Sequence, residues 1–184
     1  MTEPFHILRH EHRVIERGLR ALDGICARLN CGHQVPAEAL LEVVDFLRVY
    51  ADDFHHGKEE ANLFAMLDRR GVTRQGGLLA RLVQEHDIER KLLTAMLCAI
   101  EDYSKAGPAS KTGFVEAAYR YTRHLTGHME IEEAGLFKLA DEVLEEPDKV
   151  TLLRALNQDG DSSGLCSVDQ YVQLASELEE KWAV

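Results

Sequence analysis

Long apolar runs are missing from this 184-residue sequence, and no stretch approaches the roughly 20 apolar residues that a membrane-spanning helix needs. Positive charge is also in deficit, since 21 Lys and Arg stand against 32 Asp and Glu and the formal net charge is -11. Proteins that bind nucleic acid gather Lys and Arg into a patch or stripe, and this sequence has none. We therefore expect neither membrane nor nucleic acid as a partner, and bound cations would offset part of the acidic excess.

Cysteine is scarce, and the four cysteines include no C-x-x-C pair. The first residues, Met-Thr-Glu-Pro-Phe-His, lack the basic and then apolar layout of a signal peptide. Both absences predict a protein of the reducing cytoplasm. Cys26 and Cys98 fall on apolar helix seams, where a free thiol is most simply a small buried side chain.

Proline occurs at only four positions, and each lies where a helix should start or stop. Between these positions apolar residues recur at steps of three and four, which is typical of amphipathic helices. The predicted helices run over about Phe5–Asn30, from Pro36 or Ala37 to just before Gly71, from beyond Gly77 to about Ile100, Phe114–Leu144, Val150–Leu156 and Val168–Trp182. The predicted loops are Ser104–Gly113 and Gln158–Ser167.

Four long helices joined by short connections predict an all-α fold, namely an up-down-up-down four-helix bundle with an additional C-terminal helix. We predict that residues 1–146 form a metal-binding bundle domain and that residues 147–184 form a helical extension packed on it. The last helix contains no candidate metal ligand. We therefore expect it to pack outside the core of four helices.

Two decamers, His55–Phe64 and His128–Phe137, share the pattern His-x-x-x-Glu-Glu-Ala-x-Leu-Phe. Residues four apart in a helix differ by only about 40° around the axis, so the imidazole and the first carboxylate lie on one face. The repeat extends backwards, because Glu11-His12 and Glu85-His86 precede the decamers at nearly equal distances. The repeat supplies six candidate metal ligands: His12, His55, Glu59, His86, His128 and Glu132.

A metal centre explains this pattern better than structural alternatives do. A single histidine on an apolar seam is commonly a core residue, and a single His-Glu pair at a spacing of four is commonly a surface pair worth a few tenths of a kcal/mol. Six ionisable groups on inward faces would be costly to bury without a partner. Imidazole and carboxylate without thiolate suit iron, manganese or zinc, and six ligands fit two ions, bridged by Glu59 and Glu132.

These blocks resemble the hemerythrin-like proteins, the family with the HHE cation-binding domain. The resemblance covers roughly Phe5–Leu144 and rests on Glu11-His12, the His55-His56-x-Lys58-Glu59-Glu60 block, Glu85-His86 and His128-x-x-x-Glu132-Glu133. It implies a four-helix bundle around a non-haem diiron centre. Such centres bind oxygen, or sense or handle oxygen, nitric oxide or peroxide.

One departure concerns the number of histidines. Oxygen-carrying members of the family have a fifth histidine one turn from the histidine of the third helix, and here those positions are Leu82 and Arg90. His124, one turn before His128, restores the count from another helix, either as a ligand or as a hydrogen-bond donor beside the ligands. Its counterpart in the repeat is Ala51, so we favour a symmetric site without it.

The remaining polar residues receive lesser roles. Glu60 and Glu133 are expected to face helix interfaces or solvent, and Glu89 is a weaker alternative carboxylate ligand. Tyr121 is expected to be a core aromatic residue or to line the pocket. Four histidines are expected to lie at the surface or beside the ligands: His6, His10, His33 and His56.

The leading functional interpretation is a diiron protein that carries, stores or senses oxygen or a related small ligand. A second is a diiron redox enzyme that oxidises ferrous iron, decomposes peroxide or repairs iron centres under nitric oxide or oxidative stress. A third is a regulatory module whose metal occupancy alters a protein interface through the Val168–Trp182 helix. The sequence alone does not decide between an enzyme and a binding protein, and it names no protein partner.

Overall fold

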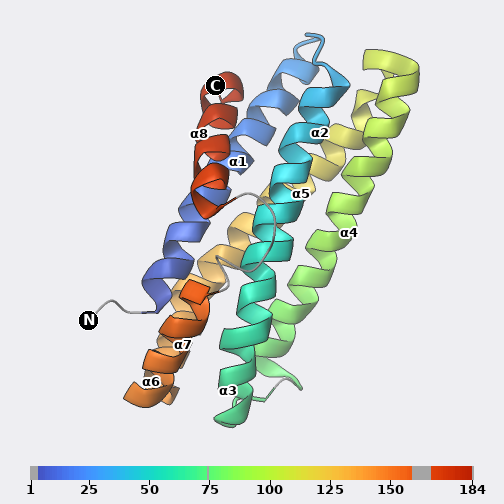
Figure 1. The fold of residues 1–184 in the computed structure, drawn as a ribbon. Coiled ribbons are helices and arrows are strands. Elements are labelled where there is room, and N and C mark those ends of the chain that lie inside the picture. Colours follow the sequence, from blue (N-terminus) through green and yellow to red (C-terminus); the bar gives the residue numbers. More distant parts are fainter. Residues whose placement is uncertain (1–3, 74, 159–166, 184) are drawn as a thin grey trace.

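The computed structural model describes residues 4–73, 75–158 and 167–183, and every regular element in these ranges is a helix. The elements in chain order are α1 (Phe5–Asn30), α2 (Ala37–Phe46), η1 (Leu47–His56), η2 (Glu59–Phe64), α3 (Ala65–Arg69), α4 (Gly77–Ala106), η3 (Gly107–Ser110), α5 (Lys111–Ile131), η4 (Glu132–Leu136), α6 (Phe137–Val143), α7 (Glu146–Gln158) and α8 (Val168–Trp182). The predicted all-helical class is confirmed. In Figure 1 long helical rods lie side by side, and they are formed by α1, by α2 to α3, by α4 and by α5 to α6.

The first rod ends as the sequence predicts. Gly32 adopts a left-handed backbone with φ of 83°, which an L side chain rarely tolerates. Its N–H donates to the carbonyl of Leu29, and the N–H of His33 donates to the carbonyl of Arg28, both at 3.0 Å. This pair of hydrogen bonds is a Schellman motif, which satisfies carbonyls at the helix end and turns the chain towards α2.

Two of the rods change from α-helix to π-helix where the decamers lie. In the second rod the π-helical segments are η1 and η2, and in the fourth rod the π-helical segment is η4. A π-helix bonds each residue to the fifth one along, so it fits one more residue into each turn and is frequent at functional sites. Residues within and after these segments are therefore rotated relative to the α-helical spacing that the sequence analysis assumes.

The predicted loop at Ser104–Gly113 is wrong. α4 continues to Ala106, the 3₁₀ turn η3 follows, and α5 already begins at Lys111. Ser104 is still helical, and its hydroxyl donates a 2.8 Å hydrogen bond to the carbonyl of Ile100, one turn back. Gly107, with φ of 71°, then reverses the chain. The loop predicted at Gln158–Ser167 lies largely outside the described residues.

The apolar core forms two clusters with a polar layer between them. On α1, Phe5 and Leu8 belong to one cluster, whereas Val14 and the apolar residues after it belong to the other. On α4 the two clusters likewise lie before and after His86, at Leu82 and Leu92. The apolar series along each rod is interrupted at the candidate metal ligands. The fold therefore places these ligands inside the molecule, in a layer with apolar side chains above and below it.

α8 packs along α1, outside the four rods (Figure 1). The contact is close at Gly24, where a Cβ atom would lie 1.9 Å from the backbone oxygen of Trp182. Ala175 and Leu178 are buried on the same side of α8. The bounds predicted for this helix, Val168–Trp182, agree with the structure.

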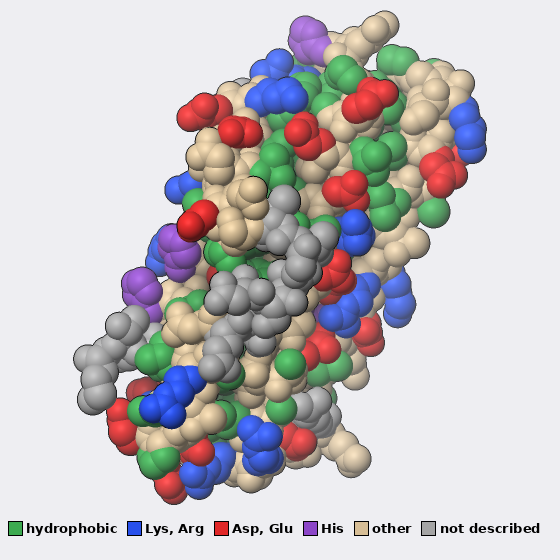
Figure 2. All heavy atoms as spheres, viewed as in Figure 1, with side chains coloured by type: hydrophobic (Ala, Val, Ile, Leu, Met, Phe, Trp, Pro, Cys, Tyr) green, Lys and Arg blue, Asp and Glu red, His purple; other side chains and the backbone are tan. Residues whose placement is uncertain are grey.

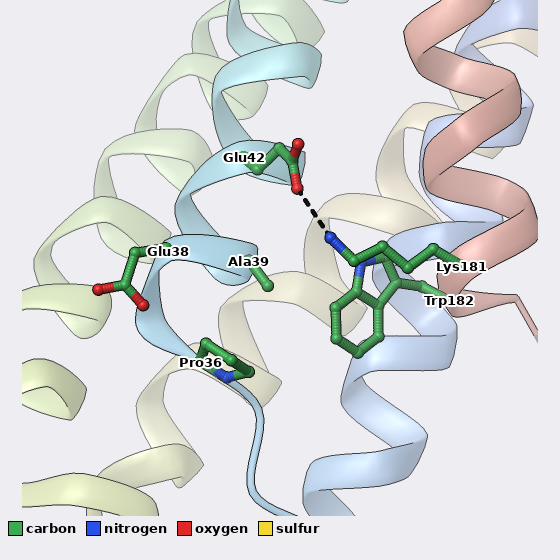
Figure 3. A pocket seen from close by; sticks show the side chains of 6 residues that line it. All are labelled: Pro36, Glu38, Ala39, Glu42, Lys181 and Trp182. Carbon is green, nitrogen blue, oxygen red and sulfur yellow. Dashed lines mark hydrogen bonds and ion pairs between the residues drawn. The ribbon is translucent and has the colours of Figure 1, made fainter.

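A pocket of about 460 Å³ lies where the end of α8 meets the start of α2 (Figure 3). Lys181 on one side of it pairs with Glu42 on the other, with Nζ and Oε2 3.4 Å apart. None of the candidate metal ligands lines this pocket. It is therefore separate from the metal centre.

The surface and the cysteines complete the comparison with the sequence. Figure 2 shows acidic and basic side chains interspersed on the face drawn. None of the described helices combines the length and the apolar character needed to cross a membrane.

Cys26 is buried as predicted, but Cys98 is exposed, so that part of the prediction is wrong. Cys98 falls outside the inward series of Leu93, Met96 and Ile100 on α4.

Candidate metal centre

The structure brings all six predicted ligands together in the polar layer, and each is at most 1% exposed. The ligand atoms of one group of four lie within 4.8 Å of one another, and so do those of a second group. The first group is His12, His55, Glu59 and Glu132. The second is Glu59, His86, His128 and Glu132. The two groups share both glutamates, which is the arrangement that two ions bridged by carboxylates require.

Each of the four imidazoles is held by a carboxylate at its Nδ1 atom. The pairs are His12 with Glu133 at 2.9 Å, His55 with Glu11 at 2.8 Å, His86 with Glu60 at 2.7 Å, and His128 with Glu85 at 3.0 Å. A neutral imidazole that donates from Nδ1 presents the lone pair of Nε2, which is the atom that binds a metal. The four carboxylates therefore orient four nitrogen ligands towards the centre.

These supporting carboxylates follow the repeat. Glu11 and Glu85 each precede a ligand histidine, and Glu60 and Glu133 each follow a ligand glutamate. Glu60 and Glu133 face helix interfaces and solvent as expected, but their contacts with the ligand histidines were not predicted. They are partly exposed, at 32% and 40%, yet one oxygen of each reaches a buried ring. Their occurrence in both decamers was the signal in the sequence.

The two shared glutamates lie between the Nε2 atoms. An oxygen of Glu132 is 3.3 Å from Nε2 of His12, and its other oxygen is 3.2 Å from Nε2 of His128. Glu59 lies 3.8 Å from Nε2 of His55 and 3.8 Å from Nε2 of His86. Nε2 of His86 and Nε2 of His128 are 3.1 Å apart. Lone pairs of several ligands thus converge in one small volume.

Many of these converging atoms have no hydrogen-bond partner among the described residues. They include both oxygens of Glu59, both oxygens of Glu132, and Nε2 of His12 and of His55. Buried polar atoms are nearly always paired, and leaving a carboxylate unpaired costs several kcal/mol. The donor set and its unpaired atoms therefore fit a bound cation.

The electrostatics of the metal-free chain also favour a bound cation. Burial and the neighbouring charge of Glu132 raise the pKa of Glu59 well above its usual value. Burial is the largest influence on Glu132 and opposes its ionisation, but the charges and hydrogen bonds of His128 and His12 together outweigh burial and lower the pKa of that carboxyl well below its usual value. Burial disfavours the His128 cation, yet Glu132 raises the pKa of this imidazole to about 11. A proton on His128 thus occupies a position that a metal ion would take.

Lys58 supports one half of the site and was not assigned a role from the sequence. Its ammonium group is buried and donates a 2.6 Å hydrogen bond to Glu11, which also accepts from Nδ1 of His55. The same ammonium lies 3.9 Å from the ring centre of Phe54. Glu85, the counterpart of Glu11, instead pairs with the exposed Arg81 and lines a surface pocket of about 340 Å³ between α4 and α5.

His124 lies at this surface pocket, and its Nδ1 atom is 2.9 Å from Oε1 of Glu89. Its side chain is 25% exposed, and it belongs to no group of three or more possible ligands among the described residues. The structure thus places His124 outside the two groups that share Glu59 and Glu132. Glu89, the weaker alternative carboxylate, is fully buried and is likewise outside those groups.

His56 differs most from the expectation. It is fully buried, so the surface position considered from the sequence is wrong, whereas His6, His10 and His33 are exposed. Its imidazole joins His86 and His128 in a third group of possible ligands. The π-helix η1 explains this, because its wider turn brings both His55 and His56 to the inward side.

Residues 3–140 match the family described as Hemerythrin HHE cation binding domain. The chain belongs to the hemerythrin HHE family. The match covers most of the chain and confirms the resemblance seen in the sequence, and it ends within α6, before α7 and α8. No curated protein and no solved structure matches the chain. The cation binding that the family description states agrees with the buried His and Glu groups.

Proposed function

We propose that this hemerythrin HHE protein is a non-haem diiron protein that binds or senses oxygen or a related small ligand such as nitric oxide or peroxide. The observation that carries the proposal is the pair of four-ligand groups that share Glu59 and Glu132. His12 and His55 would hold one iron, and His86 and His128 would hold the other. The proposed frame is an up-down-up-down four-helix bundle formed by residues 1–146, with residues 147–184 packed on it.

The bound irons would supply a redox-active Lewis acid with positions open to a small ligand. The chain's own residues hold and orient the centre. The carboxylates at the four Nδ1 atoms fix the rings, and the two apolar clusters exclude bulk water from the layer. Manganese and zinc accept the same donors, so metal analysis is part of the test.

The packing of the last helix favours a ligand-binding protein over a regulatory module. Such a module would offer the apolar face of α8 to a protein partner, but Ala175, Leu178 and Trp182 are buried against the chain itself. α7 is held in the same way, since Leu152 and Leu156 join the cluster near Phe137. We therefore place the functional event at the metal centre. We also propose a cytoplasmic location, in keeping with the free cysteines Cys26, Cys31 and Cys98.

The proposal is tested on protein purified and loaded with ferrous iron without oxygen. We expect two irons per chain and, after exposure to air, charge-transfer absorption that azide alters. Glu59→Ala should lower the occupancy of both positions, because this glutamate belongs to both groups. His33→Ala, at an exposed histidine, is the matched control and should keep two irons. A single iron in the wild type would contradict the dinuclear centre.

A further inference from the structure

We propose that the surface pocket between α4 and α5 binds a small organic anion, namely a carboxylate that carries an apolar chain. The pocket has a volume of about 340 Å³, which lies at the lower end of the range for small-molecule sites. Of the candidate metal ligands only His128 reaches its wall. The inference therefore concerns a second site, and it does not depend on which metal the centre holds.

The first support is positive charge without a partner. Three arginines, Arg81, Arg120 and Arg123, line the pocket, and Glu85 is the one carboxylate among its lining residues. Both oxygens of Glu85 are already engaged, one by Arg81 at 2.8 Å and the other by Nδ1 of His128 at 3.0 Å. In the part of the chain that the structure describes, neither Arg120 nor Arg123 forms an ion pair or a side-chain hydrogen bond.

This charge is unusual in its setting. The chain as a whole has a net charge of -11, yet two unpaired arginines lie three positions apart on α5. Side chains at this spacing are neighbours on the helix surface, so the two guanidinium groups repel each other. An anion between them would remove that repulsion. A guanidinium group donates two parallel hydrogen bonds to a carboxylate, which makes a carboxylate a well-matched anion.

The second support is the apolar surface beside the arginines. Ile88 of α4 is 40% exposed at the pocket, and Leu92 and Ile131 line it as well. Gly127 leaves the α5 side open, because a Cβ atom at this position would meet no atom within 4 Å. Glycine weakens the interior of a helix, and here no neighbouring side chain needs the room that it leaves. An apolar chain on the ligand would fill this room and cover Ile88.

The pairing of the two helices gives the ligand a direction. Glu85 contacts His128 and Glu89 contacts His124, so α4 and α5 run antiparallel. The two unpaired arginines precede His124 in α5 and lie towards one end of the pocket, whereas Ile131 lies towards the other. The carboxylate would therefore bind at the arginine end, and the apolar chain would run towards Ile131.

The probe for this site is hexanoate, titrated into the full-length protein and followed by calorimetry. Acetate lacks the apolar chain, hexan-1-ol lacks the charge, and inorganic phosphate supplies charge alone. We expect hexanoate to bind at least tenfold more tightly than any of the three. Equal affinities for hexanoate and phosphate would show a plain anion site, and equal affinities for hexanoate and hexan-1-ol would show a plain apolar one. Either result would overturn the proposal.

The charge is tested with a chain that carries both Arg120→Gln and Arg123→Gln. Both side chains are exposed, so the fold should persist, and circular dichroism checks this. We expect the affinity for hexanoate to fall at least tenfold. The matched control carries Arg69→Gln and Arg154→Gln, at two exposed arginines outside the pocket, and should stay within about twofold of the wild type. Equal weakening in the two double variants would mean that hexanoate responds only to net charge, which would overturn the proposal.

The space is tested with Gly127→Leu, which fills the open side of the pocket and leaves every charge in place. Leucine favours a helix more than glycine does, so the melting temperature should not fall. The affinity for hexanoate should fall at least tenfold while the metal content of the protein stays equal to that of the wild type. An unchanged affinity for hexanoate would place the ligand elsewhere and overturn the proposal. A wild type without two irons would contradict the proposed function and leave these results unaltered.

Discussion

The carboxylate of Glu60 lies 2.7 Å from Nδ1 of His86, although the two residues belong to different copies of the repeat. The reciprocal contact joins Glu133 of the second copy to His12 of the first, at 2.9 Å. Each copy thus holds a histidine of the other, whereas Glu11 and Glu85 hold the histidines of their own copies. Neither copy alone forms a complete half-site, which ties metal binding to the assembly of all four rods.

The first prediction concerns these cross-copy contacts. Glu60→Gln should weaken metal binding by about 10–100-fold, because a neutral amide orients His86 less firmly and lowers the basicity of its ring. Glu38→Gln, at an exposed position on α2, is the matched control. The measurement is competition with a chelator. Equal affinities for Glu60→Gln and the control would show that the 2.7 Å contact does not support the metal.

The second prediction concerns Lys58. Lys58→Met should destabilise the metal-free protein by about 3–5 kcal/mol, because it leaves the buried Glu11 carboxylate without its cation. Lys105→Met removes an exposed pair with Glu101 and should change stability little. Urea unfolding followed by circular dichroism measures both. Similar losses in the two variants would mean that the buried pair contributes no more than a surface pair.

The third prediction concerns the docking of α8. Gly24→Ala should push the end of α8 away from α1, because the new Cβ would lie 1.9 Å from the backbone oxygen of Trp182. The emission of this single tryptophan should shift to the red as it becomes hydrated, while metal binding is retained. Gly127→Ala, where a Cβ meets no atom within 4 Å, is the control. An unshifted spectrum in Gly24→Ala would show that the close contact is absent in solution.

The fourth prediction concerns protons. In the metal-free chain His128 has its pKa raised to about 11 from an ordinary value of 6.5, and burial and Glu132 also raise the pKa of Glu59. His128 therefore holds a proton at neutral pH that a metal ion must displace. Because folding raises the pKa of His128, its protonation stabilises the metal-free fold most fully below pH 6.5, and this stabilisation is lost as the pH rises towards 11.

Metal binding should consequently release protons, and its apparent affinity should increase with pH. Calorimetric titration in buffers of different ionisation enthalpy measures the number released. His128→Gln, which has no titrating ring, should release fewer protons than the wild type. Binding without proton release in the wild type would contradict the protonated state of His128 in the metal-free chain.

The sequence was informative wherever chemistry repeats with α-helical spacing. The decamers located His55, Glu59, His128 and Glu132 because residues four apart share a helix face. The bounds of α1 and α8 followed from Asn30-Cys31-Gly32 and from the apolar series of the last helix, since such end signals are local. The all-helical class and the family needed no more than these patterns.

The features of the site that the sequence did not predict have physical reasons. π-helical turns depend on tertiary packing, so α-helical spacing could not show that His56 points inward beside His55. Glu60 and Glu133 are partly exposed as expected, yet one oxygen of each reaches a buried ring on another helix, and helical spacing alone does not show such a contact. The roles of Lys58 and Glu89 depend on contacts between distant helices, with Glu11 and with His124, which no local pattern encodes.

The central claim is that two irons share Glu59 and Glu132. X-ray absorption spectroscopy at the iron edge tests it most directly, on the diferric wild type loaded with two irons per chain. We predict an iron–iron scattering vector within about 4 Å, as in sites where two metals share ligands, and its loss in Glu59→Ala. Two irons per chain without such a vector would contradict the account.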